Sequence, residues 1–204
     1  FDNRNIYYDN SIISRPGFDI MKHILKGTPS FVYSRQIVSD KWEHIFITDM
    51  ISDICLISLK TKETTYLSPL YLYPDSDSLN QEKKPNFTDS FTDFLKLKNL
   101  SDKTPETILG YIYSILYSPT YRTKYYEFLK IDFPRIPFTE DKDIFNKLSE
   151  LGQRLIDLHL LKVEFDKNIV SFPVSKPDLN VTKVEYKNNQ VWFNDTTYFD
   201  NVPQ

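Results

Sequence analysis

The sequence predicts an α+β fold in which a twisted, mostly antiparallel sheet packs on three to four helices and a hairpin lies at the C-terminal end. Three observations lead to this prediction. Short β-rich runs with polar breaks fill the first half, apolar residues recur at helical spacing over about residues 104–162, and two β-rich runs flank Asn188 and Asn189. A length of 204 residues is usual for one domain, so residues 1–204 are expected to form a single domain.

The first half begins with a polar lead-in at residues 1–14. Apolar residues at helical spacing then predict a short helix near residues 17–26, which Gly27 would end. Four β-rich runs follow, and their spacing favours antiparallel or mixed pairing. They cover Ser30–Val38, Ile45–Asp49, Ile54–Lys60 and Thr65–Tyr73. Residues 74–86 are expected to be a polar loop and are the best candidate for disorder.

The second half is predicted to be mainly helical. Thr104 and Ser118 are good N-cap residues, and each precedes a proline that suits the first helical position. Thr139 is expected to begin a longer helix, whose acidic first turn complements the positive helix end. Gly152 would let another helix approach closely. The buried apolar stripe of this helix is predicted to consist of Ile144, Phe145, Leu148, Leu151, Leu155 and Leu158.

The chain is predicted to end in a tight hairpin that belongs to the same sheet as the strands of the first half. Its strands would come from residues Thr182–Lys187 and Gln190–Phe193. The two asparagines between them tolerate the left-handed backbone conformation that a short hairpin turn requires.

Composition narrows the class of protein. Apolar residues make up 40% of the chain and aromatic residues 15%, which suffices for a sizeable core. The single Cys55 excludes an internal disulfide and a thiolate metal cluster, and its apolar neighbours predict a buried, inert thiol. No apolar run approaches the roughly 20 residues that span a bilayer. No signal peptide opens the chain, so we expect no membrane partner and a cytoplasmic location.

No group of residues points to catalysis, and we expect no catalytic, cofactor-binding or metal-binding residue in this chain. His23, His44 and His159 lie far apart and show no spacing typical of metal ligands. The chain has too few glycines for a phosphate-binding loop and lacks a GxSxG motif. The acidic run at residues 139–143 is better explained as a solvated helix start. A stand-alone enzyme would need a pocket that joins groups remote in sequence.

Nucleic-acid recognition has the strongest candidates, at residues 33–36 and 41–44. Arg35 can bridge O6 and N7 of guanine, and Gln36 can pair with N6 and N7 of adenine. Lys41 and Trp42 add a cation and an aromatic ring. From the residues alone a structural role is favoured, in which Arg35 pairs with a carboxylate and Trp42 belongs to the core. The net charge of −3 also argues mildly against a free-standing nucleic-acid binder.

A second set of cations surrounds the aromatic residues of the helical half and is a candidate for a basic ridge. Structural use of these side chains explains their position at least as well. They are Arg122, Lys124, Lys130 and Arg135.

Several words of the sequence are distinctive, above all YSPTYR at residues 117–122 and DFPRIP at residues 132–137. Others are SRQ at residues 34–36, WEHIFI at 42–47, PLYLYPD at 69–75, LHLL at 158–161 and VWFN at 191–194. In this order, over nearly the whole chain, they resemble the C-terminal target-recognition domain of type ISP single-polypeptide restriction-modification enzymes. Gly17 and Tyr117 depart from the pattern, where a basic residue and His are expected, which puts a phosphate contact near Gly17 in doubt.

The resemblance implies sequence-specific recognition of double-stranded DNA by a fragment of a longer enzyme that methylates adenine and cleaves unmodified DNA. S-adenosylmethionine, ATP and Mg²⁺ would serve that parent, and this fragment would need no cofactor. The candidate DNA-binding residues are Arg15, Arg35, Gln36, Lys41 and Trp42. The implied partners are double-stranded DNA and the methyltransferase and translocase domains of the same polypeptide.

An alternative of a different class is a non-catalytic interaction module that docks the methyltransferase and translocase domains through residues 105–130. A positive face that carries Arg35 and Lys41 would favour DNA recognition, whereas a neutral aromatic face would favour docking.

Overall fold

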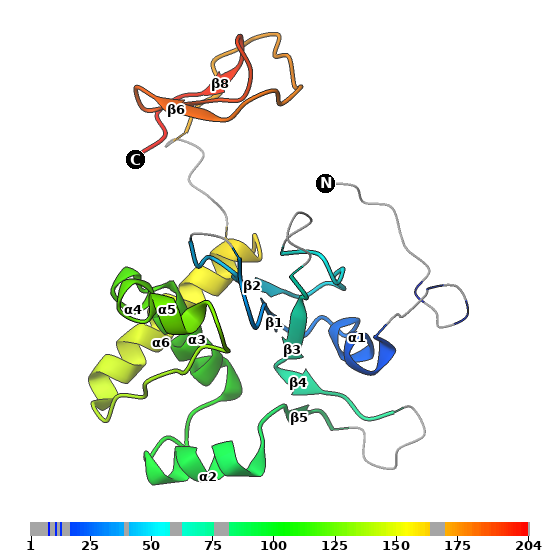
Figure 1. Ribbon diagram of the computed structural model, residues 1–204, viewed down its shortest axis with the longest axis vertical. Coiled ribbons are helices and arrows are strands. Elements are labelled where there is room, and N and C mark those ends of the chain that lie inside the picture. Colours follow the sequence, from blue (N-terminus) through cyan, green and yellow to red (C-terminus); the bar gives the residue numbers. More distant parts are fainter. Residues whose placement is uncertain are drawn as a thin grey trace. The chain divides into compact units, whose positions relative to one another are not determined.

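The chain forms two compact units, Phe1–Lys162 (unit 1) and Val163–Gln204 (unit 2), whose elements are drawn in Figure 1. The computed structural model describes residues 8, 11, 13, 17–38, 41–57, 63–75, 82–163 and 170–203. The mixture of helices and antiparallel strands confirms the predicted α+β class.

The central sheet of unit 1 has three antiparallel strands in the order β2–β1–β3 (Figure 1). The strands are β1 (Ser30–Tyr33), β2 (Ile45–Thr48) and β3 (Tyr66–Pro69). In this register Tyr33 lies opposite Ile45 on one side and Tyr66 on the other. The end of β1 and the starts of β2 and β3 therefore meet at one end of the sheet.

The strand predicted over Ile54–Lys60 is wrong where the structure describes it. Residues 54–57 form turns and bends, while residues 58–60 lie outside the described part. Asp53 Oδ1 accepts a hydrogen bond from the Cys55 N–H at 2.7 Å, and such a local bond competes with strand pairing. Cys55 is consequently half-buried, and the expectation of a buried thiol is wrong.

A second, two-stranded sheet corrects the predicted loop over residues 74–86. Strand β4 (Tyr71–Leu72) pairs with β5 (Lys84–Pro85), so the end of that loop is extended. Residues 76–81 lie outside the described part. Helix α1 (Phe18–Ile24) confirms the short helix, and Gly27 after it has a φ of 74°, which suits glycine.

Five further helices complete the described part of unit 1. They are α2 (Asp89–Leu97), α3 (Pro105–Tyr117), α4 (Pro119–Lys124), α5 (Tyr126–Leu129) and α6 (Lys142–His159). The N-caps expected at Thr104 and Ser118 are confirmed, since each hydroxyl accepts a backbone N–H of the first turn. Helix α2 was not predicted, although Thr88 caps it in the same way. Helix α6 begins later than predicted, with Asp141 as its cap.

The buried face of α6 differs from the predicted stripe by about one residue. Phe145 and Ile156 are buried, but Ile144 and Leu151 are 49% and 61% exposed. Leu148 and Leu155 are only partly buried and pack at the margin of the core, so the prediction that they are buried was wrong. The small residues Ser149 and Gly152 complete the buried face.

Glycines let α3 and α6 approach each other closely, as was predicted for Gly152. A Cβ atom built on Gly152 would lie 1.8 Å from the carbonyl oxygen of Gly110, and one built on Gly110 would lie 2.5 Å from the carbonyl oxygen of Ser149. No side chain fits between the two backbones. This contact is the most extensive between any two elements that the structure describes.

Two clusters of buried side chains flank the crossing of α3 and α6. One joins the central sheet to α3, α4 and α6 through residues such as Ile45, Tyr113 and Ile156. The other lies between α2, α3 and α6 and includes Leu95 and Phe145. Helices α3, α4 and α6 therefore pack against the central sheet.

Unit 2 contains its own three-stranded antiparallel sheet in the order β6–β7–β8. The strands are β6 (Glu185–Lys187), β7 (Gln190–Trp192) and β8 (Tyr198–Phe199). Asn188 and Asn189 have φ values of 53° and 57°, which confirms the predicted hairpin turn. The hairpin belongs to a separate sheet, so the expectation that it extends the sheet of the first half is wrong. That residues 1–204 act as one recognition domain stays a prediction.

Candidate nucleic-acid interface

Arg35 lies two residues after the end of β1, and its guanidinium group is exposed. Its Nε donates to Asp132 Oδ1 at 3.2 Å, and the two side chains are 56% and 50% exposed. The Phe133 N–H and the Arg35 guanidinium hold the pKa of Asp132 below its ordinary value, so the carboxylate is charged at neutral pH. Among the described residues, the terminal Nη groups of Arg35 make no hydrogen bond.

Three aromatic rings lie beside this ion pair. Phe133 meets Tyr33 and Tyr66 edge to face, with ring centroids 5.5 and 5.4 Å apart, and the two tyrosines stack at 5.9 Å. The guanidinium carbon of Arg35 lies 5.8 Å from the centre of the Phe133 ring. Tyr66 and Phe133 are each 40% exposed, so the rings contribute to the surface. We call these five residues, Tyr33, Arg35, Tyr66, Asp132 and Phe133, the arginine–aromatic cluster.

The backbone that follows Gln36 is anchored. The N–H of Ile37 donates to the carbonyl of Lys130 at 3.1 Å. The N–H of Val38 donates to Glu63 Oε1 at 2.6 Å, and Glu63 Oε2 lies 3.2 Å from His44 Nε2. Glu63 is only 8% exposed, so a buried carboxylate anchors the backbone at Val38 and lies beside His44. Gln36 is exposed and is presented from this fixed backbone.

The other predicted contacts have different surroundings. Trp42 is 3% exposed and belongs to the core, which favours its structural interpretation over a direct contact with a base. Lys41 is exposed. Arg15 lies outside the described residues. Arg35 and Gln36, which are neighbours in the sequence, are both exposed, and the role of all five residues in DNA binding stays a prediction.

The segment that carries Asp132 is held by hydroxyl groups from the helices. Tyr121 donates to the carbonyl of Arg135 at 2.8 Å, and Tyr111 donates to the carbonyl of Pro137 at 2.8 Å. Tyr111 also accepts the N–H of Thr139 at 3.0 Å. Burial raises the pKa of both tyrosines, which keeps their hydroxyl groups protonated. The position of Asp132 is therefore coupled to α3 and α4.

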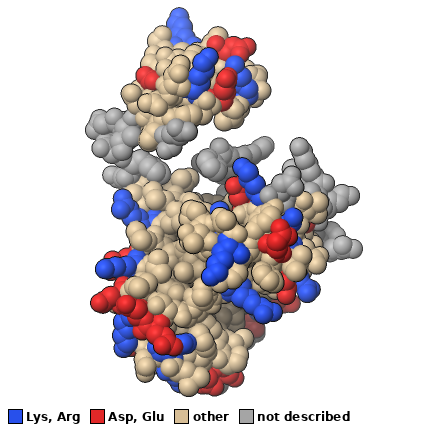
Figure 2. All heavy atoms as spheres, turned by 60° about the vertical axis from the view of Figure 1, so that its left-hand side comes forward, with Lys and Arg blue, Asp and Glu red and all other residues tan. Residues whose placement is uncertain are grey.

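The predicted basic ridge separates into inward and outward side chains. Arg122 donates from Nε to the carbonyl of Leu116 at 2.6 Å, and its guanidinium lies 4.4 Å from the Tyr117 ring and 5.4 Å from the Trp42 ring. Arg122 therefore has a structural role beside the core. Arg135 is exposed. On the face shown in Figure 2, positive and negative side chains are interspersed.

Each histidine has a structural environment of its own. The Nδ1 atom of His23 accepts the N–H of Tyr73 at 3.0 Å, and His159 Nδ1 lies 2.6 Å from the Tyr113 hydroxyl oxygen. His44 lies beside Glu63. Within the described ranges, no three His, Cys, Asp or Glu side chains gather as a metal site would require. None of the helices in the described part of the chain is long and apolar enough to cross a bilayer.

The sequence suggests no role for four residues around Arg35. Asp132 and Phe133 stand out only as part of the word DFPRIP, and no pattern marks Tyr66 or Glu63. Tyr33 and Tyr66 lie opposite each other because of the register of their paired strands, which the sequence does not show. The proline-rich word was the one available signal that the backbone near Arg35 is stiff.

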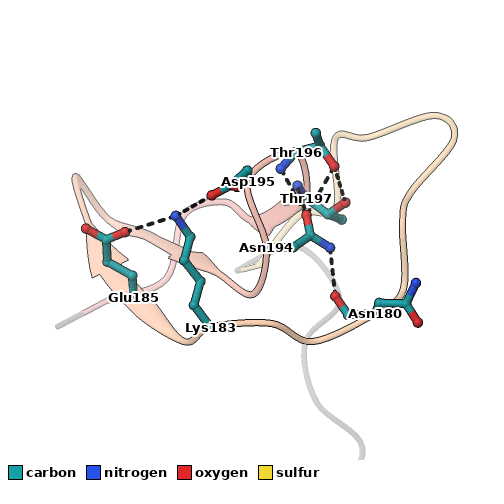
Figure 3. Close-up of polar contacts among 7 residues, drawn as sticks. All are labelled: Asn180, Lys183, Glu185, Asn194, Asp195, Thr196 and Thr197. Carbon is teal, nitrogen blue, oxygen red and sulfur yellow. Dashed lines mark hydrogen bonds and ion pairs between the residues drawn. The ribbon is translucent and has the colours of Figure 1, made fainter.

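A polar cluster organises the loops of unit 2 (Figure 3). The side chain of Asn194, 4% exposed, accepts the N–H groups of Thr196 and Thr197 at 2.9 and 2.7 Å and donates to the carbonyl of Asn180 at 2.9 Å. Lys183 pairs with Asp195 at 2.8 Å. Because every one of these contacts joins groups within unit 2, the cluster has a structural role.

Comparison with known proteins assigns the chain to a family. Residues 1–204 match the family described as the type ISP C-terminal specificity domain, so the chain belongs to that family and the resemblance in its sequence is confirmed. A comparison with curated proteins gave no match.

Solved structures show the same fold. The chain is similar to the ATP-dependent type ISP restriction-modification enzyme LlaBIII bound to DNA, with 24% identity, a TM-score of 0.62, and coverage of 87% of this chain and 11% of that one. For the DrdV–DNA complex the values are 22%, 0.66, 94% and 19%. A nuclease-deletion mutant of the type ISP enzyme LlaGI in complex with a DNA substrate mimic gives 22%, 0.56, 86% and 15%. The chain thus spans less than a fifth of each of these three proteins.

Proposed function

We propose that this chain selects the target sequence in double-stranded DNA for a longer restriction-modification polypeptide. The observation that carries the proposal is the family match over residues 1–204, since the family is one of specificity domains. The solved structures with the same fold, which are described as bound to DNA or to a DNA mimic, support it.

The surface around Arg35 is the part best suited to reading bases. The guanidinium and the amide of Gln36 are exposed, and the backbone hydrogen bonds of Ile37 and Val38 fix the segment that presents them. These two side chains match the acceptors and donors of purine edges in the major groove. With a net charge of −3, the chain is expected to bind DNA weakly and with strong salt dependence, because phosphate contacts dominate affinity.

A selection from a library of random-sequence duplexes tests the proposal. The 204-residue chain is mixed with the library at low salt, and bound duplexes are recovered and sequenced. We expect one sequence to be enriched. Arg35→Ala should relax the preference at one base position, by about 1–3 kcal/mol for a lost bidentate pair. A library that emerges without any enriched sequence would contradict the proposal.

Lys83→Ala is the matched control, because Lys83 is a cation remote from Arg35 in the chain and lies 3.8 Å from the centre of the Tyr71 ring. It should weaken binding evenly across sequences or leave it unchanged. A change of sequence preference in Lys83→Ala equal to that in Arg35→Ala would show that the loss is not specific to the site.

The activity of the longer polypeptide forms the outer part of the proposal. We propose that the parent methylates adenine with S-adenosylmethionine, uses ATP and Mg²⁺, cleaves unmodified DNA, and acts in the cytoplasm through its methyltransferase and translocase domains. Mapping of methylated adenines in a host that carries the parent should return the sequence selected by the isolated chain. A different methylated sequence would mean that another part of the parent chooses the site.

The docking alternative retains one observation in its favour. Phe128, which lies in α5 and within residues 105–130, is 70% exposed, and Ile131, which follows that segment directly, is 62% exposed. In that alternative Phe128→Ser and Ile131→Ser would weaken association with the methyltransferase and translocase domains in analytical ultracentrifugation, and duplex selection would give no sequence.

A further inference from the structure

We propose that Asp132 is a positioning residue for base recognition, which holds Arg35 so that its two terminal Nη groups point as a pair toward a guanine. This inference rests on the proposed function, and it names the residue on which the selectivity of Arg35 depends.

Asp132 contacts the guanidinium group of Arg35 through Nε alone. Asp132 Oδ1 accepts from Nε and thus occupies the side of the group, not its end. Among the described residues, Nη1 and Nη2 have no hydrogen-bond partner, although together they offer the parallel donors that guanine O6 and N7 accept. An arginine held through Nε therefore keeps the donors needed for bidentate contact with a base.

The residues beside Arg35 are themselves held by neighbouring groups. The N–H of Asp132 donates to the carbonyl of Phe128 at 3.2 Å, and Phe133 packs edge to face against both Tyr33 and Tyr66. The guanidinium carbon of Arg35 lies 5.8 Å from the centre of the Phe133 ring, so both a carboxylate and an aromatic ring restrict the side chain of Arg35. An arginine with fewer rotamers available loses less entropy when it binds.

The charge of Asp132 affects whether Arg35 contacts a base or a phosphate. The ion pair is about half exposed, and such pairs contribute little to stability, so stability does not account for it. A carboxylate beside Arg35 repels the phosphates of a DNA backbone, while it leaves the neutral edge of a base accessible. Asp132 should therefore weaken non-specific contacts of Arg35 and favour the base contact.

Binding measurements on four forms of the 204-residue chain test this inference: wild type, Asp132→Asn, Arg35→Ala and the double variant. Affinity is measured for the selected duplex and for a scrambled duplex at one salt concentration. Asp132→Asn keeps the shape of the side chain, and its effect on thermal unfolding should be small. We expect the ratio of specific to non-specific affinity to fall about 3- to 10-fold, a part of the loss expected for a whole bidentate pair.

The direction of the two affinities separates positioning from structure. In Asp132→Asn, binding to the selected duplex should fall while binding to the scrambled duplex stays equal or rises, because a negative charge has been removed. In the Arg35→Ala background, Asp132→Asn should leave the ratio unchanged. Selection with Asp132→Asn should show lost preference at one guanine position only.

The outcomes distinguish failure of this inference from failure of the proposed function. If the wild type prefers no duplex, the proposed function has failed. If the wild type selects a sequence and Arg35→Ala lowers the ratio, but Asp132→Asn leaves it unchanged or lowers both affinities equally, only the role of Asp132 is refuted. An effect of Asp132→Asn that persists without Arg35 would also refute it.

Discussion

Replacement of Gly152 by alanine tests the close crossing of α3 and α6. The new Cβ would lie 1.8 Å from the Gly110 carbonyl oxygen and 2.6 Å from its carbonyl carbon, so backbone, not a flexible side chain, must move. To restore an ordinary contact the two backbones must separate by about 1.6 Å, which weakens dispersion contacts on both sides of the crossing.

The magnitude follows from two opposing effects. Overpacking of a core costs about 1–3 kcal/mol, and a clash between backbones belongs at the upper end of that range. Alanine in a helix interior regains at most about 1 kcal/mol relative to glycine. We therefore expect Gly152→Ala to lower the free energy of unfolding by about 2 kcal/mol or more, since the propensity gain cannot offset the clash.

Urea denaturation with an unchanged m-value measures this loss. The neighbouring Glu150→Ala is the control, because Glu150 is exposed on the same helix and should change stability by no more than about 0.5 kcal/mol. If Gly152→Ala matched this control or stabilised the protein, the close approach of the helices would be wrong.

Three further predictions concern other parts of the chain. Burial lowers the pKa of His23 and His159 below 6.5. The stability that their neutral forms provide is therefore complete above about pH 6.5 and is lost as pH falls through the lowered folded-state pKa values. The difference between the melting temperatures at pH 7.5 and pH 5.5 should be smaller in a variant that carries both His23→Gln and His159→Gln. Asn194→Ala should destabilise unit 2 by about 1–3 kcal/mol, because it leaves buried backbone groups unpaired; amide hydrogen exchange measures this, and unchanged protection at Thr197 would contradict it. Phe145→Ala should cost about 3–5 kcal/mol in denaturant unfolding, whereas Ile144→Ala, at a half-exposed site, should cost far less; equal losses would restore the predicted stripe.

Local chemistry made several elements predictable. The proline after Thr104, the proline after Ser118 and the Asn188–Asn189 turn each impose backbone angles through neighbouring atoms, and all three were correct. The strand predicted from residue 54 was wrong. The composition of this run suits a strand, but the Asp53 carboxylate forms a turn there. Composition cannot decide between two such local alternatives.

The face of α6 and the surroundings of Arg35 depended on tertiary packing. Near the crossing with α3, small residues occupy the buried face, so the larger Leu151 points outward, although hydrophobicity alone places it inside. The Arg35–Asp132 pair joins residues 97 positions apart. Sequence supported an ion pair for Arg35 but contained no means to name its partner, because no periodicity connects the end of a strand with a proline segment.

The hydroxyl groups of Tyr111 and Tyr121 have a consequence for the recognition proposed at Arg35. The segment that they hold is poor in backbone donors because of its prolines, so side chains, not a sheet ladder, determine its place. Exchange of either tyrosine for phenylalanine removes a single oxygen and retains the ring that packs in the core. Such an exchange would free the backbone of the proline segment that carries Asp132 and would retain the ring in the core. Under the proposed function, the strictness of DNA recognition could then change while the fold persists.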